Sequence, residues 1–252
     1  MTINHTNGKT DLVELPWDSR AFARSCWELT CTAETPPTAK ELRALFIKKR
    51  AEVVTWRRNA NGAFAPETLH QLGFRVADLQ LCFSVPLKPR AVSSPHLRPY
   101  RSADASALNV IAAAAFEISR FSILPGVTAA AIGQRFANWS AQLVQEASDT
   151  CFVYELGNRV VGAFLSKKDT SGLNLALAAV ALGTPPGIGP YLYREAFDCY
   201  ARMGYRFGYA AISARNLPVL NLYAGLGARF TKATEILMWC REWERASDQA
   251  PQ

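Results

Sequence analysis

The sequence predicts an α/β (α+β) fold, with a mixed central sheet, helices on both faces of the sheet and a smaller α/β domain at the N-terminal end. Two observations lead to this prediction. Strand-like runs alternate along the chain with apolar residues at helical spacing, and a Pro-rich stretch over residues 86–99 separates two unequal parts. Of the 252 residues, 49% are hydrophobic and 19% charged, as in globular proteins. We expect a disordered tail over 1–11, an N-terminal domain over 12–95 and a second domain over 96–252.

The N-terminal part reads as strand, helix, strand, short helix, strand. The first helix is expected over 38–49, where Thr38 and Glu41 form a capping box. The short helix over 66–72 ends at Gly73, a residue suited to a helix C-terminus. The three strands are expected over 26–32, 51–57 and 74–85.

The second part contains a strand, two helices, three strands and then alternating helices and strands. Gly157-Asn158 lies between two strand-like runs and predicts a two-residue hairpin. The helices are expected over 105–116, 126–147, 190–203 and 217–224. The strands are expected over 97–100, 151–156, 159–167, 173–182, 207–212 and 234–240.

Composition excludes several classes of function. The formal charge of +7 suits an anionic partner, but the basic residues are dispersed and no nucleic-acid recognition motif is present. The six Cys form no CxxC pair and there are three His, so no metal site is expected. The polar first ten residues do not resemble a signal peptide, and the apolar run 173–182 is about half of a membrane helix. We expect a soluble, reduced, cytoplasmic protein with neither a membrane nor a nucleic-acid partner.

The segment that carries chemistry begins after the buried strand over 173–182. Gly187-Ile188-Gly189 follows it and opens a helix, whose first N–H groups lack partners and lie at the positive end of the helix dipole. A diphosphate is the natural ligand of such a helix start. Glycine lets the phosphates approach the main chain closely, and Pro190 suits the first helical turn.

The residues that follow make this segment similar to a known family. Asn216 comes after the next strand, and Tyr223 lies seven residues later in N-x-x-V-x-x-x-Y, before Gly225-Leu226-Gly227-Ala228. With the strand, glycine turn and helix in this order, residues 97–240 resemble the GNAT acetyltransferases (general N-acetyltransferases). The motif Leu15–Ser19, and Phe116–Phe121 with Phe136 and Trp139, resemble the TDP-fucosamine acetyltransferase group, which has a small N-terminal domain.

The resemblance implies a splayed GNAT sheet, acetyl-CoA as cosubstrate and a set of site residues. Exposed main chain at Val180, Ala181 and Leu182 would hold the pantetheine arm, with Asn216 contacting it or capping its helix. Tyr223 would be the general acid that protonates the CoA sulfur. The diphosphate would lie on the loop and helix start, formed by Thr184, Gly187, Ile188, Gly189 and Pro190. Thr184 replaces the family's Gln or Arg, and Pro186 removes an N–H, so weaker CoA binding is expected.

The implied acceptor is the primary amine of a dTDP-linked amino sugar. Arg120 would pair with the diphosphate, Phe121 would stack on thymine and Trp17 would line the opposite wall. Ordinary roles remain open for each: a salt bridge for Arg120 and packing between domains for Trp17. No general base is evident, and Glu155, Glu195 and Asp198 are candidates by residue type alone.

Three alternatives stay open at this point. In the first, the acceptor amine belongs to an antibiotic, a polyamine or a protein. In the second, the chain binds acyl-CoA without turnover, which Thr184 in the Arg position would favour. Nucleic-acid binding rests on the charge alone. A homodimer is a possible state of the chain.

Overall fold

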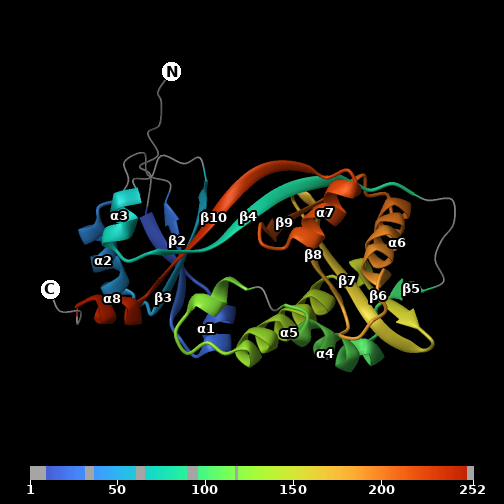
Figure 1. Cartoon of the computed structure of the whole chain (residues 1–252), viewed down its shortest axis with the longest axis horizontal. Coiled ribbons are helices and arrows are strands. Elements are labelled where there is room, and N and C mark those ends of the chain that lie inside the picture. The colour runs from blue at the N-terminus through green and yellow to red at the C-terminus, as the bar shows by residue number, and fades with distance from the viewer. Residues whose placement is uncertain (1–9, 32–36, 61–65, 90–95, 117–118, 249–252) are drawn as a thin grey trace, which may run out of the picture. The chain divides into compact units, whose positions relative to one another are not determined.

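The computed structural model describes residues 10–31, 37–60, 66–89, 96–116 and 119–248 (Figure 1). Its strands are β1 (Thr10–Glu14), β2 (Cys26–Cys31), β3 (Val53–Asn59), β4 (Arg75–Pro86), β5 (Leu97–Pro99), β6 (Cys151–Leu156), β7 (Arg159–Asp169), β8 (Gly172–Val180), β9 (Phe207–Ser213) and β10 (Arg229–Cys240). Its α-helices are α1 (Pro16–Phe22), α2 (Ala39–Lys48), α3 (Pro66–Gln71), α4 (Ala105–Ala114), α5 (Ala129–Glu146), α6 (Ile188–Arg202), α7 (Leu217–Gly225) and α8 (Arg241–Asp248). Hydrogen-bonded neighbours follow the order β1-β2-β3-β10-β4-β9-β8-β7-β6-β5. The mixed α/β fold with a splayed sheet is confirmed.

The chain forms two compact units that do not follow chain order. The first comprises Met1–Gln80, Arg120–Val127 and Ala233–Gln252, and the second comprises Leu81–Ser119 and Thr128–Lys232. Strands β4 and β10 therefore have residues in both units. The expected boundary near residue 95 lies outside the described residues, and the division into separately folding domains stays a prediction.

The first unit has its core between β1–β3, the end of β10 and helix α2. Strand β10 pairs antiparallel with β3, from Thr234 opposite Asn59 to Cys240 opposite Val53. Phe46 of α2 packs against Trp239 with ring centroids 4.8 Å apart. The Thr38–Glu41 capping box begins α2 as predicted.

Three elements of the first unit differ from expectation. Thr10 and Asp11 pair with β2, so the expected tail over 1–11 is two residues too long, and its other residues lie outside the described part of the chain. Helix α1 was not predicted; it has Pro16 in its first turn, where a missing N–H costs no hydrogen bond. Helix α8 follows β10 directly and was also not predicted.

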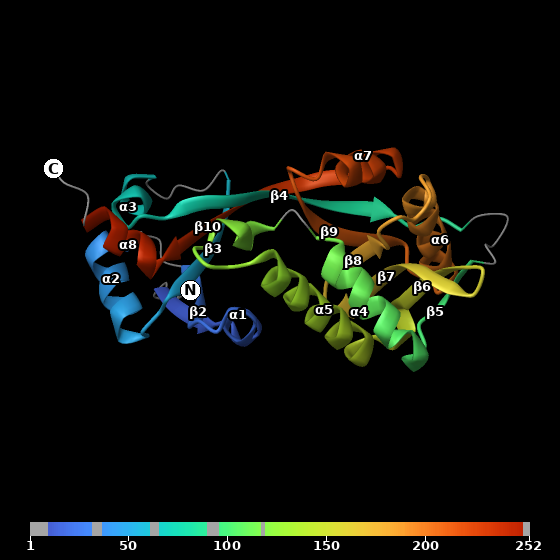
Figure 2. The same cartoon turned by 60° about the horizontal axis from the view of Figure 1, so that its bottom comes forward.

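The second unit has one hydrophobic core on each face of its strands. Figure 2 shows α4 and α5 side by side on one face of β6–β8, with α6 on the other. Leu108 and Leu143 represent the first core, and Phe164, Leu192 and Tyr200 the second. The predicted hairpin joins β6 to β7, with Gly157 and Asn158 both at positive φ as a two-residue turn requires. Among the described residues no helix is both long and apolar enough to cross a bilayer.

A partly buried ion network holds strand β5 in place. Both Arg98 Nη atoms donate to the Asp104 carboxylate at 2.8 Å, and Arg98 Nε donates to Glu155 at 2.5 Å. Hydrogen bonds from Arg98 lower the pKa of Asp104, helped by the Arg101 N–H. Asp104 is 6% exposed, so its charge depends on these partners.

We expect Asp104→Asn to lower the free energy of unfolding by about 2–4 kcal/mol at pH 7. The folded-state pKa of Asp104 lies below the unfolded value of about 3.9, so its stabilisation is complete above that pH and is lost as pH falls through the folded pKa. Denaturant titrations should therefore show the gap to wild type closing below about pH 4. The control is Glu146→Gln, whose partner Lys167 is exposed and which should change little at either pH. A gap equal at pH 7 and pH 3 would contradict this account.

Candidate functional site

The site begins where two parallel strands part. Strands β8 and β9 pair only at Leu173–Gly208 and Asn174–Tyr209. Immediately afterwards β8 carries an extra residue, because its register with β7 moves from Asn174–Lys167 to Leu177–Leu165. Such a bulge bends a strand and ends its pairing.

The bulge also exchanges the two faces of β8. Leu173 and Leu175 belong to the core with α6, whereas Leu177 and Ala179 belong to the core with α4 and α5. A regular strand would keep all four side chains on one face. The sheet is therefore splayed from residue 175 onward, with β7 on one side of β8 and open space on the other.

The open edge of β8 presents main-chain groups in a strand conformation. Ala181 N–H donates to Val161 at 2.8 Å, so its position bonds with β7. Antiparallel pairing alternates, and the N–H and C=O of Val180 and Ala178 therefore point away from β7, toward the edge that β9 has left. An extended chain containing amides can add to such an edge as an extra strand. The Ala181 N–H, which was expected to be exposed, instead bonds to β7 and cannot donate to a ligand.

The loop before α6 has few N–H groups left for a ligand. Gly187 lies at φ +94° as the N-cap of this 15-residue helix, and a Cβ at Gly187 or Gly189 would meet no atom within 4 Å. The Ile188 N–H donates weakly to Pro185 at 3.4 Å, and Pro190 has no N–H. The N–H groups of Gly187 and Gly189 therefore remain for a phosphate.

Thr184 has a local structural role in this loop. Its Oγ1 and its N–H both reach the Ala181 carbonyl, at 2.6 and 3.2 Å, and close the turn that follows β8. Thr184, Gly187 and Ile188 are outside the lining of the adjacent cavity.

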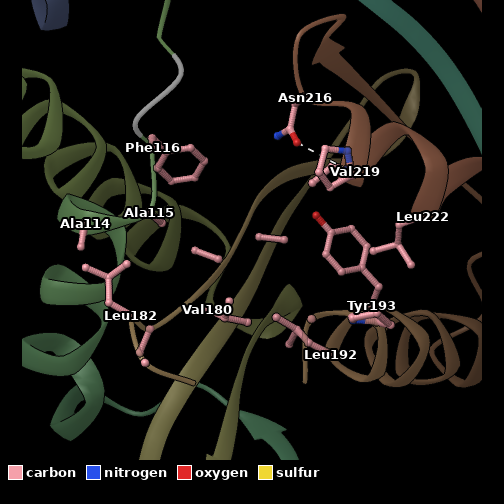
Figure 3. Close-up of a pocket in the computed structure, with 17 residues that line it drawn as sticks. Ala114, Ala115, Phe116, Val180, Leu182, Leu192, Tyr193, Asn216, Val219 and Leu222 are labelled. Atoms are coloured by element: carbon pink, nitrogen blue, oxygen red, sulfur yellow. Dashed lines mark hydrogen bonds between the residues drawn. The ribbon is translucent and has the colours of Figure 1, made fainter. Parts of the chain in front are cut away.

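A cavity of about 640 Å³ extends from this loop along the open edge of β8 (Figure 3). Its lining includes six of the nine residues predicted to bind the cosubstrate: Val180, Ala181, Leu182, Gly189, Pro190 and Asn216. The end of α4 forms one side in Figure 3, and α6 and α7 form the other. The remaining lining residues are Ala114, Ala115, Phe116, Ala178, Ala179, Gly183, Leu192, Tyr193, Pro218, Val219 and Leu222.

Two tyrosines meet at the α6–α7 side of the cavity. Tyr193 lines it and turns its hydroxyl toward the open space (Figure 3). Tyr223 is 2% exposed and lies behind it, with ring centroids 5.2 Å apart. The Tyr223 hydroxyl donates to the Tyr193 oxygen, and burial raises both pKa values, so both phenols stay protonated at neutral pH. The residue that faces the cavity is therefore Tyr193, which the sequence analysis missed.

Asn216 combines a structural and an exposed group. Its Oδ1 accepts the Val219 N–H at 3.4 Å and caps α7. Because the cap uses the oxygen, the amide nitrogen is left on the cavity side (Figure 3). Both roles considered for this residue are therefore compatible in one geometry.

The three residues predicted for the acceptor belong to the first unit. Phe121 is 2% exposed. Its ring centroid lies 4.8 Å from that of Phe22 and 4.5 Å from the Arg120 guanidinium carbon. Stacking of a base on Phe121 would therefore require that one of these neighbours move. Trp17 is 41% exposed, with the Arg20 guanidinium 4.4 Å from its ring.

The three carboxylates considered as a general base are outside the cavity lining. Glu155 pairs with Arg98, and Asp198 pairs with Arg202 at 2.9 Å. Glu195 is on α6 but not in the cavity lining. Within the described part of the chain no group of three His, Cys, Asp or Glu could hold a metal ion.

We expect Gly189→Ala to weaken acetyl-CoA binding about tenfold, the cost of one main-chain hydrogen bond to a charged group. The new methyl group has free space and an ordinary φ, so the fold should tolerate it, but it occupies the approach to the N–H. Gly225→Ala is the matched control, because Gly225 is also helical with open space and lies outside the cavity. Calorimetric titration of both variants decides: equal dissociation constants would remove Gly189 from the phosphate site.

Comparison with known proteins identifies the fold. No protein-family model matches the sequence, and no curated protein matches it. Among solved structures, a GCN5-related N-acetyltransferase from Sphaerobacter thermophilus is similar over 92% of this chain and 76% of its own, with a TM-score of 0.63 and 13% identity. A tandem GNAT protein from the clavulanic acid biosynthesis pathway matches over 85% and 75%, with a TM-score of 0.54 and 12% identity. A glucosamine N-acetyltransferase region of a fungal multi-domain β-N-acetylglucosaminidase matches 92% of this chain and 31% of that one, with a TM-score of 0.60 and 11% identity. The chain has the GNAT acetyltransferase fold.

Proposed function

We propose that this protein is a GNAT N-acyltransferase, which moves an acyl group from acyl-CoA to a primary amine by direct attack. The observation that carries the proposal is the splay of β8 from β9, which leaves strand-like main chain beside a cavity that starts at the glycine loop before α6. A pantetheine arm is an extended chain with two amides and fits such an edge. The diphosphate of CoA fits the N–H groups of Gly187 and Gly189.

Each part of the cavity then has a role in the reaction. When acyl-CoA is bound, its thioester carbonyl is the electrophile. The amine nitrogen forms the new C–N bond, the C–S bond breaks, and the sulfur receives a proton. Tyr193, whose hydroxyl faces the cavity, gives that proton to sulfur, and the proton that the amine nitrogen loses on forming the amide returns to the Tyr193 oxygen. Tyr223, the predicted general acid, donates a hydrogen bond to that oxygen and stabilises it in between. In this proposal the Val180 N–H, on the open edge of β8, donates to the carbonyl oxygen.

For the acceptor we propose the 4-amine of a dTDP-linked amino sugar, with acetyl-CoA as the simplest donor. The support is the sequence similarity at Leu15–Ser19 and Phe116–Phe121, together with the net positive charge. An amino sugar is also the acceptor named for the fungal structural neighbour, a protein that shares the fold. Arg120 is the residue proposed to pair with the diphosphate.

The test is a scan of amine acceptors with acetyl-CoA, measured as release of free CoA thiol. dTDP-amino sugars, UDP-amino sugars, polyamines and aminoglycosides make up the scan, and thiol release with a dTDP-amino sugar is expected. Arg120→Gln should then raise the KM for that sugar about tenfold and leave the KM for acetyl-CoA unchanged. Release with another amine alone would assign a different acceptor. Tight acetyl-CoA binding without turnover of any amine would contradict the enzymatic proposal.

A further inference from the structure

The cavity has an apolar wall opposite α6 and α7 (Figure 3). Ala114, Ala115 and Phe116 at the end of α4 form this wall. Among the 17 described residues that line the cavity, none carries a charge. The polar side-chain groups, Tyr193 and Asn216, are on the opposite side.

The wall is packed from behind. The Phe116 ring stacks on Phe136 of α5 with centroids 4.1 Å apart and planes 19° apart. Phe136 in turn packs against Trp139, with ring centroids 6.1 Å apart. Ala115 and Phe116 also pack against the core that α4 and α5 share with β6–β8. The wall is therefore part of the folded unit and is formed before any ligand binds.

Such a wall favours an apolar group next to the thioester. A charged acceptor placed against it would lose its hydration and find no partner. An acetyl group has one methyl and would leave most of the wall uncovered. Methylene groups would gain from contact with it, about fourfold in affinity for each one fully buried.

From this lining we infer that the transferred group is longer than acetyl, an aliphatic acyl chain of the butyryl to octanoyl class that lies against Ala114, Ala115 and Phe116. This inference rests on the proposed function and concerns its donor. The reaction is otherwise unchanged: an amide forms from the amine and the acyl carbon, and CoA leaves with a proton on sulfur.

Calorimetric titration of the full-length protein with CoA, acetyl-, butyryl-, hexanoyl- and octanoyl-CoA tests the inference without an acceptor. We expect affinity to rise from acetyl- to hexanoyl-CoA by about tenfold or more. Equal or falling affinity along the series would overturn the inference and leave the proposed function intact. If no CoA compound binds, the proposed function fails and the inference with it.

Two variants of α4 localise the effect. Ala115→Leu fills the wall and should remove the advantage of hexanoyl-CoA, about tenfold, while the dissociation constant of acetyl-CoA stays unchanged. Val110→Leu, in the same helix, exposed and outside the lining, should change neither constant. If Ala115→Leu weakens acetyl- and hexanoyl-CoA equally, the wall contacts the pantetheine arm and the inference is wrong.

Discussion

Replacing Tyr193 with Phe should lower kcat for acyl transfer by about 100- to 1000-fold and leave the dissociation constant of acetyl-CoA unchanged. The ring of Tyr193 keeps its packing against Phe164 and Tyr223, so the cavity keeps its shape. Only the hydroxyl that faces the cavity is lost, and general acid catalysis contributes about 10²–10⁴ to a rate. Steady-state thiol release and calorimetry measure the two quantities separately.

Tyr223→Phe should have a smaller effect on kcat, about tenfold, because it removes one hydrogen bond behind the proton donor. If the two phenols act in series, the double variant should be no slower than Tyr193→Phe alone. Tyr205→Phe is the control, since Tyr205 packs against Tyr200 in the same aromatic cluster but lies outside the cavity lining. Wild-type turnover in Tyr193→Phe would exclude both tyrosines from proton transfer as described here.

The second large effect is expected at Gly133, where α5 crosses α4. A Cβ built on Gly133 would lie 2.5 Å from the main-chain oxygen of Ala113, so the two helices would have to separate. In an open helix Gly→Ala stabilises a protein by up to about 1 kcal/mol. Here the overlap is with main chain, and we expect Gly133→Ala to lower the free energy of unfolding by about 1–3 kcal/mol.

Gly225→Ala, in the same unit, should change the free energy of unfolding in the opposite direction. Its Cβ would meet nothing within 4 Å, so a small increase in stability is expected. Chemical denaturation of the two variants compares the signs directly. Separation of α4 from α5 should also shift Ala115 and Phe116, so Gly133→Ala should reduce binding of hexanoyl-CoA more than binding of acetyl-CoA. A stabilised Gly133→Ala variant would show that the helices do not cross as closely as described.

Local patterns in the sequence predicted most of the second unit. The order of helices and strands from β5 to β10 is correct, because the sequence there has clear apolar periods and punctuating residues such as Gly157 and Asn216. The turn at Gly187 and the helix cap at Asn216 were predicted for the same reason, since a glycine turn and a capping Asn are local signals. Six of the residues predicted to bind the cosubstrate line the cavity, and their binding role stays a prediction.

The features that were missed depend on distant contacts. The pairing of β10 with β3 joins residues about 180 positions apart, and no local pattern specifies it. The bulge in β8, between Asn174 and Leu177, has no Gly or Pro to mark it in the sequence and appears only as a change of register with β7. Tyr193 could have been found, because it lies one helical turn after Gly189 and such residues share a helix face. Tyr223 matched the family spacing, but its hydroxyl reaches the cavity only through Tyr193.

The most direct test of the central claim is a crystal structure of the protein with CoA bound. We expect the diphosphate on the N–H groups of Gly187 and Gly189, the pantetheine amides bonded to the main chain of Ala178 or Val180, and the sulfur within hydrogen-bond reach of the Tyr193 hydroxyl. CoA bound away from the open edge of β8, or a sulfur with no contact to Tyr193, would contradict the account.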